Sequence, residues 1–200
     1  MRVLCVTNDF PPRAGGIQAF VHGVLVRQPQ DSVVVYAPKW KGDAAFDAEQ
    51  PFPAMPHLTC VGHSAADLHA IADQLHAEGY RNIMALRGDP PKGETTFVPY
   101  HDGLRYGSDH VPLLTQRHPD FCLGVGGYPE KHPESPSIDH DIDVLKAKID
   151  AGATRAISQF FFDIDAFLRF RDRVRAAGVT IPLIPGIMPV SNFAGLVRMC

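Results

Sequence analysis

Seven short apolar runs are the strongest constraint on the fold of this 200-residue chain. Each is nearly continuous in apolar character, as strands of a parallel sheet are when both faces are buried. Helical patterns separate most of the runs, so the alternation favours an α/β fold with a parallel sheet. The predicted strands are RVLCVT (2–7), SVVVYA (32–37), HLTCVG (57–62), NIMALR (82–87), FCLGVG (121–126), RAISQFFF (155–162) and IPLIPGI (181–187).

Apolar residues at helical spacing predict the helices between these strands. Ser64 and Asp67 have the spacing of a capping box, and Gly79 is typical of the end of the same helix. The other predicted helices cover 138–151, 164–177 and a shorter segment that includes Ile17, Phe20 and Val24 after Gly15 and Gly16.

The strand and helix units indicate a (β/α)8-type TIM barrel that is incomplete, because eight units of a typical barrel take about 250 residues. Seven strands are predicted here, and an open sheet of the same order is the alternative. Residues 38–56 contain four prolines without firm periodicity, which predicts a long loop or a seam.

Composition excludes several classes of function. The net charge is −3 without a basic stripe, so we expect no nucleic-acid partner. The apolar runs are too short to span a bilayer, and the N-terminus does not resemble a signal peptide, so we expect a cytoplasmic protein. The four cysteines are dispersed, which indicates a reduced protein. The ten histidines show no zinc-like spacing with a cysteine or an acid, so no metal site is predicted.

Polar residues gather where the predicted strands end, which is where α/β folds bind ligands. Arg87, Gly88 and Asp89 follow one strand, and Tyr128 and His132 follow the next. Asp89 could bond a pterin amino group and ring nitrogen together, whereas Tyr128 offers a ring face. Gly88 has no side chain and therefore allows a ligand to approach the backbone closely.

Further along the chain, Gln159 can donate and accept hydrogen bonds together, as a pterin or flavin edge requires. Lys148, with Arg87 and His132, could supply positive charge for a diphosphate. Asp141 and Lys148 lie seven residues apart on one edge of a predicted helix, placed toward a shared groove.

Simpler interpretations remain open for each feature. The Arg87–Asp89 segment could be a turn with a local ion pair. Asp141 and Lys148 could form a solvated helix edge. Phe160, Phe161 and Phe162 suit a hydrophobic core better than a stacking platform.

From His57 to about Asn192 the chain resembles methylenetetrahydrofolate reductases, flavin-dependent barrel enzymes of one-carbon metabolism. The resemblance rests on the segments PHLTCVG, ALRGDPP, GGYPEKHPES, LKAKIDAGATRAISQFFFD, FLRFRDR and IPGIMPVSNF. It implies a barrel that holds FAD at its carboxyl face. It also implies that NADH or NADPH reduces the flavin, which passes hydride to 5,10-methylenetetrahydrofolate.

The resemblance also implies roles for individual residues. Asp89 and Gln159 would contact the folate and carry the catalytic role, and Asp89 would tune the flavin electrostatically. The implied FAD contacts are His57, Arg87, Gly88, Asp89, Tyr106, Tyr128, His132, Asp141 and Lys148.

The first 50 or so residues resemble instead the start of a GT-B glycosyltransferase of the phosphatidylinositol mannosyltransferase kind. We therefore expect a hybrid chain, with a Rossmann-like βαβ segment at 1–56 and barrel strands three to seven at 57–200. A right-handed βαβ unit is common to both folds and could replace the first two barrel strands. A non-catalytic chimeric scaffold and a sugar-nucleotide or phospholipid-binding remnant are the alternative functions.

The N-terminal replacement predicts impaired catalysis. Reductases of this kind carry a glutamate general acid before a Phe-Pro-Pro phrase, and NDFPPR places Asn8 at that position. An amide cannot deliver a proton at neutral pH. Gly195 stands where the family tends to have a folate-contacting glutamine, and the eighth barrel unit is expected to be missing. Open strand edges would then favour homo-oligomers.

Overall fold

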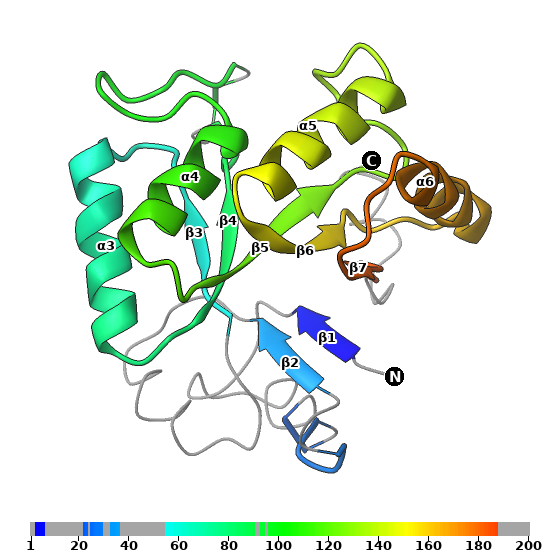
Figure 1. Cartoon of the computed structure of the whole chain (residues 1–200), viewed down its shortest axis with the longest axis horizontal. Helices are drawn as coiled ribbons and strands as arrows, with labels where there is room; N and C mark the ends of the chain where they lie inside the picture. The colour runs from blue at the N-terminus through cyan, green and yellow to red at the C-terminus, as the bar shows by residue number, and fades with distance from the viewer. Residues whose placement is uncertain are drawn as a thin grey trace.

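A five-stranded parallel sheet forms the main body of the protein, for which a computed structural model describes residues 3–6, 22–23, 25–29, 33–36, 55–90, 93–94 and 96–187 (Figure 1). Its strands follow chain order, and every neighbouring pair is parallel. This confirms the predicted α/β class. The strands are β3 (His57–Thr59), β4 (Asn82–Leu86), β5 (Cys122–Gly127), β6 (Ala153–Ser158) and β7 (Leu183–Ile184).

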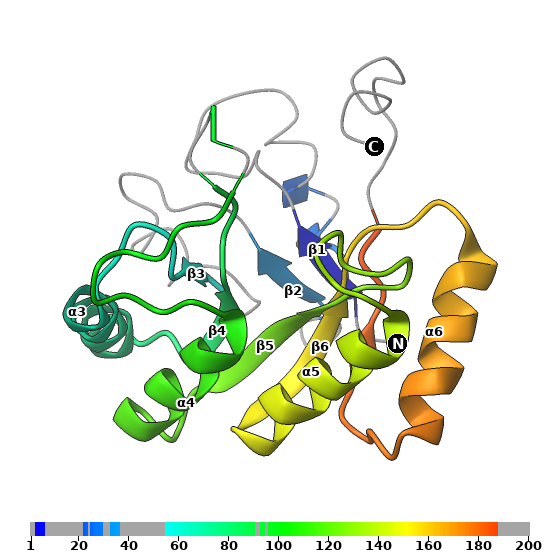
Figure 2. The same cartoon turned by 90° about the horizontal axis from the view of Figure 1, so that it is seen from above.

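Helices cover one face of this sheet (Figure 2), because the strands follow chain order and right-handed crossovers in one direction all lie on the same side. They are α3 (Ala65–Ala77), α4 (Gly107–Arg117), α5 (Ile138–Asp150) and α6 (Ile164–Ala176). On the opposite face lie β1 (Val3–Val6) and β2 (Val33–Tyr36), which pair in parallel as a separate two-stranded sheet.

Local signals set the bounds of several elements as predicted. The Ser64 hydroxyl accepts from the Asp67 amide at 3.0 Å, and the Asp67 carboxylate accepts from the Ser64 amide at 2.9 Å, which completes the capping box of α3. Gly79 follows α3 with φ of +92°, and Gly178 follows α6 with φ of +85°. Both positive φ values suit glycine, and the sequence predicted this role for Gly79.

Other expectations differ from the structure. Helix α4 was not predicted, because Pro112 interrupts its pattern. Strand β6 ends at Ser158, so Gln159 and the three phenylalanines lie beyond the strand rather than in it. Of the short helix expected near 17–24, the structure describes helical residues 22, 23 and 25, and Gly15 and Gly16 lie outside the described residues.

The hydrophobic core has two parts, one on each face of the sheet. On the helix side, Ile83, Leu123 and Ala156 pack against α3–α6. On the other face, Met84 and Ile157 pack with Met55 in a smaller cluster. Strand residues alternate between the two, as a two-sided sheet requires.

The five-stranded sheet is consistent with part of a TIM barrel. Among the described strands, β2 is not paired with β3, so closure of a barrel stays a prediction. Within the same described residues, no helix combines the length and the apolar character that crossing a membrane demands.

Candidate functional site

The carboxyl ends of β4, β5 and β6 meet at one edge of the sheet. Gly127 of β5 pairs with Ser158 of β6, and the backbone N–H of Gln159 donates to the Gly127 carbonyl at 2.7 Å. The Val61 amide likewise donates to the Arg87 carbonyl at 3.0 Å. The residues that follow these strands therefore leave the sheet at the same edge.

Arg87 is held at this edge by a second charged side chain. Its Nη1 and Nη2 donate to the two carboxylate oxygens of Glu134 at 2.7 and 2.9 Å. Its guanidinium also lies 4.8 Å from the ring centroid of Phe97. The paired hydrogen bonds and the aromatic contact fix the direction of the arginine.

Tyr128 and His132 come from the loop after β5. Their rings meet edge to face at 4.7 Å. The His132 amide donates to Asp141 Oδ2 at 2.9 Å, which ties this loop to the first turn of α5. The Glu134 amide donates to His132 Nδ1 at 3.1 Å. In the neutral ring Nε2 therefore carries the proton and can donate to an acceptor.

The charges of these groups interact. Burial, followed by the charge of Arg87, lowers the pKa of His132. Burial raises the pKa of Tyr128; the charge of Arg87 opposes this shift, and the carboxylates of Asp141 and Asp89 add to it. Tyr128 is therefore a neutral phenol, beside a guanidinium, at physiological pH.

Lys148 lies half-buried on α5, seven residues after Asp141. Burial lowers the pKa of its ammonium group, and the Asp141 charge opposes this shift. Among the described residues, no hydrogen bond or ion pair to this ammonium is found. A cation withdrawn from water in this way is stabilised by an anionic ligand.

Gly88 forms the turn that ends β4. Its φ is +88°, and a Cβ there would lie 2.6 Å from Val61 Cγ1. Only glycine relieves both constraints, so the Arg87–Asp89 segment is a tight strand-end turn as well as part of the cluster. The two interpretations of this segment are compatible.

Of the remaining candidate site residues, three lie at or near the carboxyl edge of the sheet and one does not. Asp89 and Gln159 are exposed and follow β4 and β6 at the same edge. Tyr106 precedes α4 and is 53% exposed, where a Cβ on the adjacent Gly107 would lie 3.5 Å from the Arg87 amide. His57 is different, because it is the first residue of β3 and pairs with Met84 in the middle of β4, so it does not follow a strand end as the other residues do.

Two contacts at this edge have no signal in the local sequence pattern. Glu134 belongs to the GGYPEKHPES segment, but nothing in its spacing indicates that it pairs with an arginine 47 residues earlier. Phe97 lies in the long β4–α4 connection, which has no periodic pattern. Both contacts depend on how loops fold back over the strand ends.

The profile of a known family matches residues 44–200, and that family is described as methylenetetrahydrofolate reductase. The chain belongs to this family. The 5,10-methylenetetrahydrofolate reductase of Escherichia coli is 49% identical over 140 residues, covering 70% of this chain and 45% of the relative. Methylenetetrahydrofolate reductase 2 of Saccharomyces cerevisiae is 41% identical over 145 residues, covering 71% and 24%. The chain thus spans less than half the length of these reductases.

Solved structures support the fold of this reductase-family chain. A Clostridium thermocellum protein, described as binding two copies of 5-methyl-5,6,7,8-tetrahydrofolic acid, superposes with a TM-score of 0.62 at 12% identity, covering 99% of this chain and 69% of that chain. A phosphonopyruvate hydrolase gives 0.64 at 14% identity, covering 99% and 72%. Likeness at such low identity concerns the fold alone.

Proposed function

We propose that this chain binds FAD at the edge formed by the carboxyl ends of β4, β5 and β6. The observation that carries the proposal is the convergence of Arg87 and His132 on Tyr128, with Lys148 close enough to His132 for its charge to lower the pKa of the imidazole. The cations of Arg87 and Lys148 and the Nε2–H donor of His132 suit a diphosphate, and the phenol suits a neighbouring aromatic or polar ligand edge. Membership of the reductase family favours a flavin dinucleotide among such ligands.

The donor set fits this group. Lys148 needs an anionic partner, and His132 has an Nε2 proton to donate. Arg87 shares its guanidinium with Glu134, so a bound diphosphate would compete with that carboxylate. Tyr106 and Gly88 border the same edge, whereas His57 is level with Met84 in the middle of β4 and lies further from that edge.

We further propose a substrate and a reaction. FAD, when bound, would accept hydride from NADH or NADPH and deliver it to the methylene carbon of 5,10-methylenetetrahydrofolate. The bond from that carbon to N10 would break and N10 would take up one proton from water, which gives 5-methyltetrahydrofolate. Asp89 and Gln159 are exposed at this edge and would hydrogen-bond the folate pterin, with Asp89 adding negative charge near the flavin. The protein would act in the cytoplasm, as a homo-oligomer.

Turnover is proposed to be weak. Asn8 occupies the position expected for the proton-donating glutamate, and it lies outside the described residues. A carboxamide there orients a ligand without protonating it. Flavin binding and folate reduction are therefore separable in this chain.

The separate β1–β2 sheet favours a second candidate. Residues 1–43 also lie outside the family match, so the N-terminal segment has an origin of its own in this proposal. A chimeric α/β scaffold without catalysis, or a glycosyltransferase remnant that binds a sugar nucleotide or a phospholipid, would then be the function.

A titration with FAD tests the first candidate. Flavin fluorescence should be quenched by the wild-type chain, and Lys148→Ala should weaken FAD binding at least tenfold. Lys146→Ala is the matched control, because Lys146 is exposed on the same helix. If the folded protein does not bind FAD, the proposal of a flavoprotein is excluded. Binding of a GDP-sugar would support the proposal of a glycosyltransferase remnant.

A further inference from the structure

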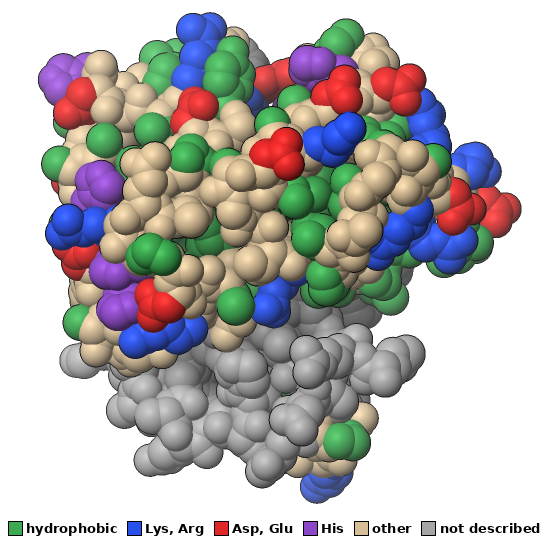
Figure 3. All heavy atoms as spheres, in the orientation of Figure 1, with side chains coloured by type: hydrophobic (Ala, Val, Ile, Leu, Met, Phe, Trp, Pro, Cys, Tyr) green, Lys and Arg blue, Asp and Glu red, His purple; other side chains and the backbone are tan. Residues whose placement is uncertain are grey.

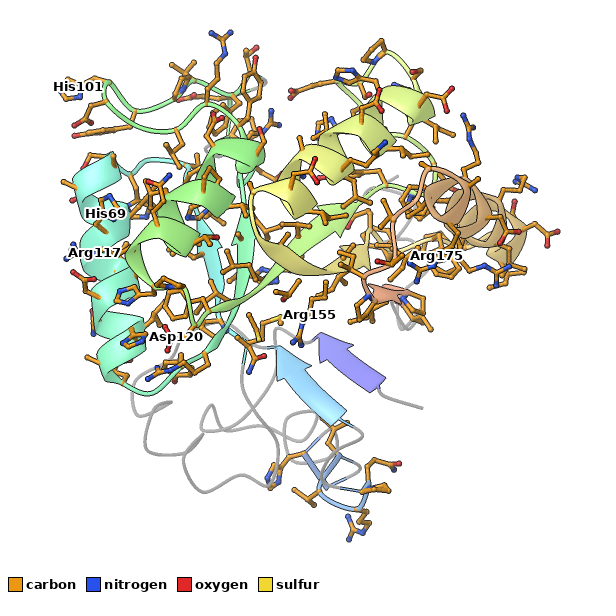
Figure 4. The ribbon with its side chains drawn as sticks, in the orientation of Figure 1. His69, His101, Arg117, Asp120, Arg155 and Arg175 are labelled. Carbon is orange, nitrogen blue, oxygen red and sulfur yellow. The ribbon has the colours of Figure 1, made fainter. Side chains whose placement is uncertain are left out.

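A second group of ligand-type side chains lies at the other end of the sheet. His76 is in the last turn of α3, and His118 and Asp120 belong to the connection between α4 and β5. One ligand atom from each of the three lies within 4.8 Å of the other two. Figure 3 shows histidine, acidic and basic side chains together beside the lower end of α3, where Figure 4 labels Asp120.

Packing orders the two histidines. Their rings stack with centroids 4.2 Å apart and planes 15° apart. Both rings also contact Phe121, at centroid distances of 5.6 and 5.0 Å. Since Phe121 is 5% exposed, the pair rests on the hydrophobic core. The ring planes are nearly parallel, so the two rings must rotate before a nitrogen of each can face one ion.

His118 is held in place by a chain of two further side chains, Asp73 and Arg117. Asp73 Oδ1 lies 2.8 Å from His118 Nε2, which leaves Nδ1 as the lone-pair nitrogen of the neutral ring. A carboxylate behind an imidazole is how proteins orient metal-binding histidines. Arg117 in turn binds both oxygens of Asp73, at 2.8 and 2.6 Å.

Within the cluster, the carboxylate of Asp120 contacts the imidazole of His76. Asp120 Oδ1 and Oδ2 lie 3.0 and 2.9 Å from His76 Nε2, and Arg81 Nε donates to Oδ2 at 2.8 Å. An ion that enters between His76 and Asp120 would replace this contact, while Arg81 keeps its hold on the second oxygen. The nearby guanidinium charges weaken the attraction for a cation, so imidazole coordination must supply most of the affinity.

We propose that His76, His118 and Asp120 bind one divalent transition-metal ion of the zinc class. Two imidazoles and one carboxylate suit Zn²⁺, Co²⁺ or Ni²⁺, whereas Mg²⁺ and Ca²⁺ prefer oxygen ligands throughout. The ion would join α3 to the α4–β5 connection. Because this site lies at the amino end of the strands, its role is to stabilise the fold rather than to take part in flavin chemistry.

The test uses the metal-free full chain. Calorimetry should find one Zn²⁺ per chain with displaceable binding, and Co²⁺ should give visible absorption that Zn²⁺ abolishes. His76→Gln, His118→Gln and Asp120→Asn should each weaken Zn²⁺ binding at least tenfold. Zn²⁺ should raise the melting temperature of the wild type more than that of these variants.

His101→Gln is the matched control. His101 also pairs with an aspartate, at 2.9 Å from Asp102, but it lies at the opposite end of α3 (Figure 4). This variant should bind Zn²⁺ as the wild type does. The proposal is overturned if the wild type binds no Zn²⁺, in which case the cluster is an ion-pair network, or if all three ligand variants bind with unchanged affinity.

Discussion

Arg87 and Glu134 form a two-point ion pair at the carboxyl edge of the sheet, with nitrogen–oxygen distances of 2.7 and 2.9 Å. The arginine side chain is 19% exposed, whereas the glutamate is 59% exposed. The carboxylate therefore lies on the solvent side and shields a cation that would otherwise face a ligand. The pair orients Arg87 and at the same time reduces the positive potential of the candidate FAD site.

Glu134→Gln should tighten FAD binding by about fivefold, because a ligand phosphate would no longer compete with a carboxylate charge near the protein surface. The amide oxygen keeps one hydrogen bond to Arg87. Fluorescence titration measures the change, with Glu130→Gln as the control from the same loop. Weaker binding in Glu134→Gln would show that orientation of Arg87 matters more than its charge.

Lys148→Met should raise the melting temperature of the FAD-free protein at pH 7. Burial lowers the pKa of this lysine, so the folded state gives up its proton more readily than the unfolded state. The destabilisation of the folded state by the buried charge of Lys148 is fully present below the pKa of the folded state. It disappears as pH rises toward 10.5, the ordinary pKa of lysine. Thermal melts should therefore converge for the two proteins at high pH, and Lys146→Met should show no such trend.

His110→Leu should make the protein less sensitive to acid. His110 is fully buried, its Nδ1 lies 3.1 Å from the Leu86 carbonyl, and burial lowers its pKa from 6.5 to about 4. The unfolded state takes up a proton first, so stability is lost as pH falls from 6.5 toward 4. The loss is at most about 3 kcal/mol.

Denaturant unfolding at several pH values would measure this effect. The slope of stability against pH in that window should be smaller for His110→Leu than for the wild type. His101→Leu, at an exposed position, should leave the slope unchanged. Equal slopes for all three proteins would mean that other groups control acid unfolding.

Gly88→Ala should destabilise the protein more than Gly93→Ala, by about 2 kcal/mol. Both glycines have positive φ, +88° and +99°, so both alanines suffer backbone strain. Only at Gly88 does a Cβ meet a neighbour, Val61 Cγ1 at 2.6 Å, and nothing lies within 4 Å at Gly93. Urea unfolding compares the two variants, and equal losses would mean that Val61 moves aside freely.

Short-range pattern was sufficient to predict much of this fold. Continuous apolar runs predicted all five strands of the main sheet, and the Ser64–Asp67 spacing predicted the start of α3. Such signals depend on neighbours within one or two turns, which sequence displays directly. Helix α4 was missed because Pro112 breaks the same kind of signal.

Contacts between distant segments could be inferred only in part. Arg87, Tyr128 and His132 were expected together, since parallel strands end at one edge. The pairing of Arg87 with Glu134 and the approach of His76 to Asp120 join residues 47 and 44 positions apart. Their meeting depends on loop paths and on helix packing across crossovers, which no local periodicity encodes. The arrangement of these side chains at both ends of the sheet was therefore decided by the tertiary structure.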